Sequence, residues 1–111
     1  MAQLDEYQKI IQTILTQHAQ ATPAYGEIER QTLFDCERNH YQLVNIGWEK
    51  HRRIYGCLIH IDIKDDKIWI QYDGTEIGVA NELVELGVPK QDIVLAFHSP
   101  FMRQLTEFAV G

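Results

Sequence analysis

Hydrophobic residues at intervals of three and four along the first twenty positions predict an amphipathic helix. The positions on its apolar face are Leu4, Tyr7, Ile11, Ile14, Leu15 and His18. We expect the helix to end at Thr22-Pro23, because proline disfavours helical geometry in the residue before it. Tyr25-Gly26 then supplies a turn. The chain is therefore expected to begin with one helix that packs through a single face.

A block of strands is predicted next. Segments 27–35 and 41–48 carry hydrophobic residues in partial alternation, and the polar segment 37–40 connects them. From residue 54 to residue 63 the alternation is strict, which is typical of a strand with one buried face. The pattern assigns five side chains to that face: Tyr55, Cys57, Ile59, Ile61 and Ile63.

A tight turn is expected at residues 64–67, which read Lys-Asp-Asp-Lys. Aspartate tolerates the positive φ angles of a type I′ turn better than most residues. Residues 68–72 would return as the partner strand of a hairpin. This hairpin is the best-defined element of the pattern.

After residue 73 the hydrophobic period changes from two to 3.6, which predicts a second helix. Asp73 or Thr75 is a suitable N-cap, and Gly87 stands where a left-handed residue would end the helix. The expected apolar stripe comprises Ile77, Ala80, Leu83 and Val84.

The last part of the chain predicts a one-turn connector at 88–92, a short buried strand at 93–97 and a final helix. The stripe of that helix would be Phe101, Leu105 and Phe108. Consecutive strands between helices indicate a single α+β domain over residues 1–111. We expect an N-terminal helix, a mostly antiparallel sheet of about four to five strands, and two C-terminal helices packed on the sheet.

Charge and composition narrow the function. Ten Lys and Arg against sixteen Asp and Glu give a net charge of −6, which argues against a broad nucleic-acid-binding face. The two cysteines form no CxxC pair, and the acidic start of the chain lacks the layout of a signal peptide. No apolar run approaches the roughly 20 residues that cross a bilayer. A cytoplasmic protein without membrane contact is expected.

Two histidines and an aspartate are candidates for metal chemistry. His60 and Asp62 would share one face of a strand, and His98 would be a third ligand or a base. A zinc site needs three or four ligands, so a polar pair in contact with water is the simpler interpretation. We therefore predict no metal and no cofactor.

Two further groups are candidates for partner binding. The dense basic run Lys50-His51-Arg52-Arg53 would touch a phosphate backbone or an acidic surface, or would simply form a solvated loop. Trp69, Gln71 and Asp73 would share the strand face opposite Ile68, Ile70 and Tyr72. The tryptophan is either an interface anchor or covered by a helix. The candidate partner-binding residues are therefore Arg52, Arg53, Trp69, Gln71, Asp73 and His98.

Motifs for catalysis are absent from the sequence. The glycines form no dinucleotide or phosphate-binding loop, and no nucleophilic arrangement is visible. We therefore predict a protein that is not an enzyme and has no catalytic residues.

Several strings in the chain resemble consecutive blocks of the XisI family, the fdxN element excision controlling factors typical of cyanobacteria. The blocks run in order along essentially the whole chain. They include segments 25–29, 40–44, 52–57, 67–71, 73–78, 86–89, 92–95 and 97–98.

The resemblance implies an accessory role in programmed DNA excision during heterocyst development, beside a site-specific recombinase. It also implies a partner, an XisH-like protein of nuclease fold, and carries over no catalytic residue. Three alternatives stay open: direct DNA binding through the Lys50–Arg53 loop, antitoxin-like inhibition of the partner, and a metal-dependent enzyme or small-molecule binder that uses His60, Asp62 and His98. A homo-oligomer is also compatible with the sequence.

Overall fold

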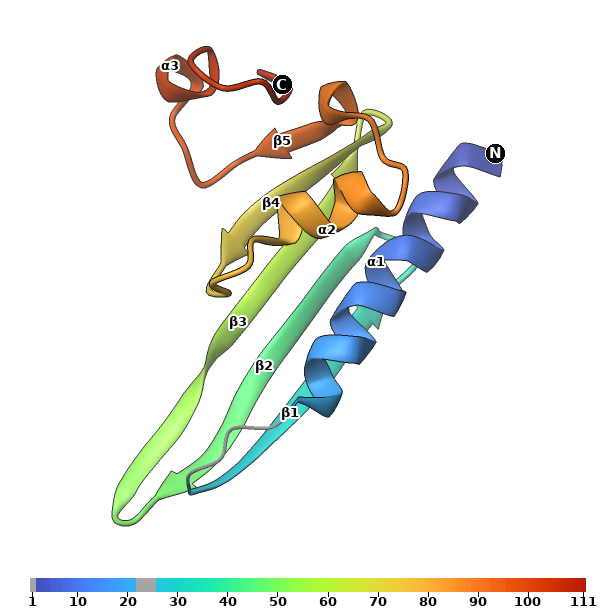
Figure 1. Ribbon diagram of the computed structural model, residues 1–111. Helices are drawn as coiled ribbons and strands as arrows, with labels where there is room; N and C mark the ends of the chain where they lie inside the picture. Colours follow the sequence, from blue (N-terminus) through green and yellow to red (C-terminus); the bar gives the residue numbers. More distant parts are fainter. Residues whose placement is uncertain (1, 22–25) are drawn as a thin grey trace.

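The computed structural model describes residues 2–21 and 26–111, which form three α-helices, one 3₁₀ turn and five strands (Figure 1). The elements in chain order are α1 (Ala2–Gln20), β1 (Glu27–Asp35), β2 (His40–Glu49), β3 (Arg52–Lys64), β4 (Lys67–Asp73), α2 (Val79–Glu85), η1 (Lys90–Asp92), β5 (Ile93–Leu95) and α3 (Pro100–Arg103).

The five strands form one sheet in the order β1-β2-β3-β4-β5. The first three pairings are antiparallel, and β4 pairs with β5 in parallel. The parallel pairing follows from α2, which carries the chain back across the sheet between the two strands. The predicted α+β class and mostly antiparallel sheet are confirmed.

Both α1 and α2 cover the same face of the sheet, which we call the helix face (Figure 1). α1 lies over β1 and β2, and α2 lies beside it over β4. The opposite face, which these two helices leave uncovered, is the open face. The core is the layer between the helices and the sheet. Its fully buried members include Ile11, Ile14, Leu15, Tyr41, Leu43, Ile59, Ile61, Ile68, Ile70, Val79, Leu83 and Ile93.

The N-terminal helix packs as its pattern predicts. Four of the six residues of the apolar face are buried, and His18 at its end pairs with Glu82 of α2 across 2.9 Å. The Tyr7 hydroxyl donates to the Asp92 carboxylate, and partial burial, with Asp92 beside it, raises the pKa of Tyr7. The helix ends at Gln20. The expected helix stop at 22–23 and turn residue Tyr25 lie outside the described residues.

The β3–β4 turn and the end of α2 confirm two predictions of local geometry. Asp65 and Asp66 both have positive φ, 53° and 62°, as a type I′ turn requires. Gly87 has φ of 100°. Its N–H donates to the Val84 carbonyl, and the following Val88 N–H reaches back to Leu83, which is a Schellman motif.

One face assignment on β3 is wrong, because the strand contains a β-bulge. Leu43 of β2 pairs with Ile59, whereas the next residue, Val44, pairs with Cys57, so Leu58 is an extra residue. An extra residue moves the side chains on one side of it to the other face. Ile59, Ile61 and Ile63 are therefore buried on the helix face, while Tyr55 and Cys57 lie exposed on the open face.

The predicted C-terminal helix is also wrong in its length, and of its expected stripe only Phe108 is partly buried against the core. α3 is a single turn that begins at Pro100 with Ser99 as its N-cap, and Phe101 and Leu105 are 68% and 69% exposed. Beyond α3 the chain turns back, and Ala109 forms a parallel bridge with Val94 of β5. Ile77, expected in the stripe of α2, precedes that helix and is exposed.

The β2–β3 hairpin extends beyond the ends of α1 and α2, so the tip of the sheet projects from the body (Figure 1). We call residues 49–53 the hairpin tip. In the described part of the chain no helix is long and apolar enough to span a membrane.

Close approach of β1 to β2 makes one glycine essential to the sheet. A Cβ at Gly47 would lie 2.0 Å from the Glu27 carbonyl oxygen. We expect Gly47→Ala to destabilise the fold by about 2–3 kcal/mol, because two backbones must separate. Urea unfolding measures the change.

The matched control is Gly56→Ala on the neighbouring strand, where a Cβ meets nothing within 4 Å. It should leave the unfolding midpoint unchanged or raise it slightly, since glycine weakens a strand. Equal effects of the two substitutions would contradict the packing described for β1 and β2.

Candidate functional site on the open face of the sheet

A second bulge regroups the candidate residues on β4. His60 pairs with Tyr72, whereas Ile61 pairs with Ile70, so Gln71 is the extra residue. Tyr72 therefore lies on the open face with Trp69, and Asp73 turns to the helix face. The prediction that Trp69, Gln71 and Asp73 share one face opposite Tyr72 is wrong for this reason.

Asp73 holds the beginning of α2. Its Oδ2 accepts from the Val79 N–H at 2.8 Å, and its Oδ1 accepts from the N–H and the hydroxyl of Thr75 at 2.9 and 2.6 Å. Gly78 at the N-cap offers no side chain. Asp73 thus replaces the missing cap, as one of the two residues that the sequence offered for this role.

Trp69 lies on the open face, where the side chains of Lys64 and Arg103 partly cover its ring. Its indole N–H donates to the Lys64 carbonyl at 3.0 Å, and the Lys64 ammonium lies 4.8 Å from the ring centroid. The Arg103 guanidinium from α3 contacts the same ring at 5.6 Å. The alternative in which a helix contributes to covering this tryptophan is the one observed.

Other apolar side chains on the open face are more exposed than Trp69. On β2, Tyr41 and Leu43 are buried on the helix face, so the alternating positions Gln42 and Ile46 lie on the open face. Cross-strand partners share a face in an antiparallel pair. Leu33, opposite Gln42, and Tyr55, opposite Ile46, therefore also lie on the open face. We call four side chains the open-face patch. They are Leu33 (50% exposed), Trp48 (48%), Tyr55 (74%) and Tyr72 (51%).

Further exposed apolar side chains form a separate group around α3. This group, the C-terminal group, comprises Phe97, Phe101, Met102, Leu105 and Val110. The sequence suggested neither group, because Leu33, Trp48 and Tyr55 sit in strand patterns that only the register and the bulges orient.

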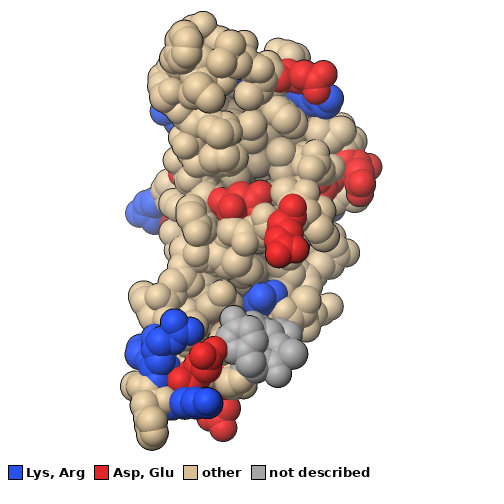
Figure 2. Space-filling model, turned by 60° about the vertical axis from the view of Figure 1, so that its left-hand side comes forward, with Lys and Arg blue, Asp and Glu red and all other residues tan. Residues whose placement is uncertain are grey.

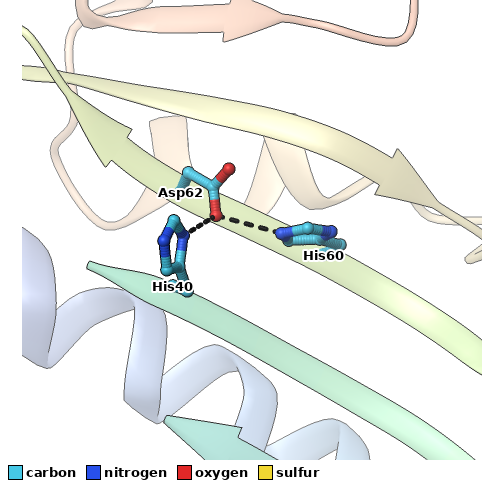
Figure 3. Close-up of side chains that lie close together, drawn as sticks. All are labelled: His40, His60 and Asp62. Carbon is cyan, nitrogen blue, oxygen red and sulfur yellow. Dashed lines mark hydrogen bonds and ion pairs between the residues drawn. The ribbon is translucent and has the colours of Figure 1, made fainter. Parts of the chain in front are cut away.

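His40, His60 and Asp62 meet on the open face near the body of the molecule (Figure 3). Asp62 Oδ1 lies 2.8 Å from His40 Nδ1 and 3.0 Å from His60 Nε2. His40 and Asp62 are direct cross-strand partners, and His60 precedes Asp62 by two residues on β3. The three side chains therefore point to one place, and they are the described residues that could hold a metal ion together.

The observed cluster differs in one residue from the group of His60, Asp62 and His98 that the sequence predicted. His98 follows β5, where its ring packs against Phe97 at 4.6 Å between centroids, and it does not join His60 and Asp62. His40 takes that place. The sequence assigned His40 to a connection. Extending β2 by one residue and counting the hairpin register would have found the pair with Asp62.

Basic side chains gather at the hairpin tip, where Lys50, Arg52 and Arg53 are exposed (Figure 2). The Arg52 guanidinium lies 3.5 Å from Glu49, and the Arg53 guanidinium lies 5.3 Å from the Trp48 ring centroid. Arg53 thus stacks on a member of the open-face patch. At the hairpin tip, a positively charged side chain is therefore in contact with an exposed aromatic ring.

The thiol of Cys57 also lies on the open face. It donates to the Ile59 carbonyl at 3.2 Å. Partial burial raises the pKa of Cys57, with that hydrogen bond acting in the opposite direction. The group therefore stays protonated at neutral pH and is a poor nucleophile.

These features define a small α+β protein whose five-stranded sheet has one face covered by two helices and one open face. The chain belongs to the XisI family: the family model described as XisI protein matches residues 1–110. The predicted resemblance is confirmed. No curated protein matches the chain.

Two crystal structures share this architecture. A XisI-like protein from Anabaena variabilis is 45% identical, with a TM-score of 0.90 over 97% of this chain and 99% of that one. The fdxN element excision controlling factor XisI from Anabaena variabilis is 30% identical, with a TM-score of 0.84 over 98% and 99%.

The contacts of Asp73 assign it a structural role that can be measured. Asp73→Ala should lower the free energy of unfolding by about 1–2 kcal/mol, because three donors near the start of α2 lose their acceptor. Urea unfolding followed by circular dichroism gives the change.

The neighbouring Gln71→Ala is the control, since Gln71 is exposed. It should leave stability within about 0.5 kcal/mol of the wild type. An Asp73→Ala protein as stable as the wild type would contradict the capping role.

Proposed function

We propose that this protein is a non-enzymatic controlling factor in the excision of a DNA element, and that it acts by binding an XisH-like partner of nuclease fold through its open face. Membership of the XisI family supports the process, together with the 30% identical relative described as an excision controlling factor. The open-face patch is the observation that carries the mode of action. A site-specific recombinase complex is the assembly in which this contact would operate.

The chemistry of the open-face patch suits a protein partner. Aromatic side chains bury a large area at little conformational cost and dominate binding energy at interfaces. Tyr55 and Trp48 lie on the projecting half of the sheet, where a partner reaches them without displacing α1 or α2. Arg53, stacked on Trp48, adds a charged group to the same surface.

Net charge supports the same interpretation. A chain of net charge −6 is repelled by a phosphate backbone and attracted by a basic surface. The DNA-handling surface of a nuclease-fold protein is of the second kind. An antitoxin-like mode, in which the chain occupies that surface and inhibits the partner, is one form of this proposal. It needs acidic side chains of the chain to face the partner, because a basic surface would repel the exposed Lys50, Arg52 and Arg53 of the hairpin tip.

The interface is tested by co-purifying the full chain with the XisH-like protein and measuring the dissociation constant. The double substitution Tyr55→Ser and Tyr72→Ser should weaken the complex at least about tenfold, because exposed aromatic anchors carry binding energy. Rising salt should also weaken wild-type binding, and DNA cleavage by the partner, with and without this chain, tests inhibition.

Ile77→Ser is the matched control, since Ile77 is 67% exposed and lies in the loop before α2, on the side of His18. Phe101→Ser tests the C-terminal group. If Phe101→Ser alone abolishes the complex, or if no complex forms at low salt, the proposed interface is wrong. Sedimentation of the chain alone reports self-association through the same face.

Direct DNA binding is the second candidate, and the hairpin tip is the observation that favours it. A two-stranded β-ribbon fits the major groove, and Lys50, Arg52 and Arg53 would contact phosphates. Under the main proposal, duplex DNA binds no more weakly to the Arg52→Ala, Arg53→Ala protein than to the wild type.

Fluorescence anisotropy with labelled duplex across a salt series makes this measurement. Lys9→Ala, on the exposed side of α1, is the control for loss of a positive charge. Tight binding at low salt that is lost only in the Arg52→Ala, Arg53→Ala protein would favour the DNA-binding alternative.

A further inference from the structure

We propose that His40, His60 and Asp62 form a binding site for a divalent transition-metal ion, with Zn²⁺ as the ion that fits best. The site lies on the open face and does not depend on the proposed partner. It rests on the convergence of two imidazole nitrogens and one carboxylate oxygen from two adjacent strands (Figure 3).

The backbone fixes the three ligands in place. β2 and β3 are hydrogen-bonded neighbours, and His40 stands directly opposite Asp62 in their register. His60 and Asp62 are two residues apart on one strand, so both point to the open face. Sites built on strands hold their geometry better than sites built on loops.

The distances are close to those of a metal site. The two nitrogens lie 2.8 and 3.0 Å from Asp62 Oδ1, and all three ligand atoms lie within 4.8 Å of one another. Zinc bonds of about 2.0–2.1 Å at tetrahedral angles separate two ligands by roughly 3.3 Å. Small side-chain rotations therefore bring the ligands around one ion.

The ligand set selects the metal. Imidazole favours zinc and related first-row ions, whereas calcium and magnesium prefer sites made of oxygen alone. Three protein ligands leave a fourth position for water or a further group, as in exchangeable zinc sites. That position would face solvent, because the His40 side chain is 56% exposed, while those of His60 and Asp62 are 30% and 18% exposed.

The surrounding charges are compatible with a cation. Asp35 is the cross-strand partner of His40, and its carboxylate is held by the N–H groups of Glu37 and Arg38 and by the Arg38 guanidinium at 3.5 Å. The Lys64 ammonium, on the other side, is stacked over Trp69, away from a direct ion pair with Asp62. A metal would replace the two hydrogen bonds that the imidazoles now make to Asp62.

The test uses the full chain, treated with a chelator and titrated with Zn²⁺ in isothermal calorimetry. We expect one ion per chain and a dissociation constant in the micromolar range or below. His60→Gln and Asp62→Asn, which keep hydrogen-bonding ability, should each weaken Zn²⁺ binding by at least about 10–100-fold. Loss of a group that only hydrogen-bonds to a metal ligand already has an effect of this size, so loss of a ligand should have at least the same effect. Co²⁺ should give a visible spectrum without thiolate charge transfer, which excludes Cys57 as a ligand.

His98→Gln and His51→Gln are the controls, since neither residue belongs to the cluster. Circular dichroism in the absence of metal checks that each variant folds. Wild-type binding that is no tighter than that of His60→Gln would overturn the proposal and leave a hydrogen-bonded network. Loss of binding in His98→Gln or His51→Gln would overturn it equally, by assigning the ion to another place.

Discussion

Two strand insertions, Leu58 in β3 and Gln71 in β4, control which side chains reach each face of the sheet. Each is a β-bulge: it places one extra residue in its strand where the neighbouring strand has two consecutive residues with no residue between them. Because side chains alternate with a period of two, one extra residue exchanges the faces of everything beyond it. The core and the open face both depend on these two positions.

On the helix face, the insertions allow the isoleucines of β3 and β4 to meet α1 and α2 while Asp73 turns toward the start of α2. On the open face, they bring Tyr55, Cys57 and Tyr72 to the surface. The same strand segments therefore stabilise the fold with one set of residues and expose aromatic groups with another. The two bulges that bury the isoleucines on the helix face therefore also expose these side chains on the open face.

The open face thus carries two chemically distinct regions. Near the body, a carboxylate lies between two imidazoles on the register of β2 and β3. Toward the hairpin tip, Trp48 and Tyr55 are exposed and Arg53 stacks on Trp48, whereas Tyr72 is the cross-strand partner of His60 and lies beside the first region. In this member of the XisI family, the proposed contact with a protein partner uses the aromatic side chains of the open face.

Hydrophobic periodicity was sufficient for α1, the strands and α2, since local burial patterns and turn residues such as Asp65, Asp66 and Gly87 act over a few positions. It was not sufficient for the C-terminal helix, which is a single turn with Phe101 and Leu105 exposed. The N-terminal helix, the strands and the acidic character all follow from the sequence by itself, and the segments that resemble the XisI family were enough to identify that family. Tertiary structure decided the faces. A bulge is set by pairing with a neighbouring strand and leaves no mark in the alternation of residues 54–63, so the positions of Tyr55, Tyr72 and Asp73 needed the sheet. His40 met Asp62 for the same reason: their contact is a matter of register between strands, which no single strand encodes.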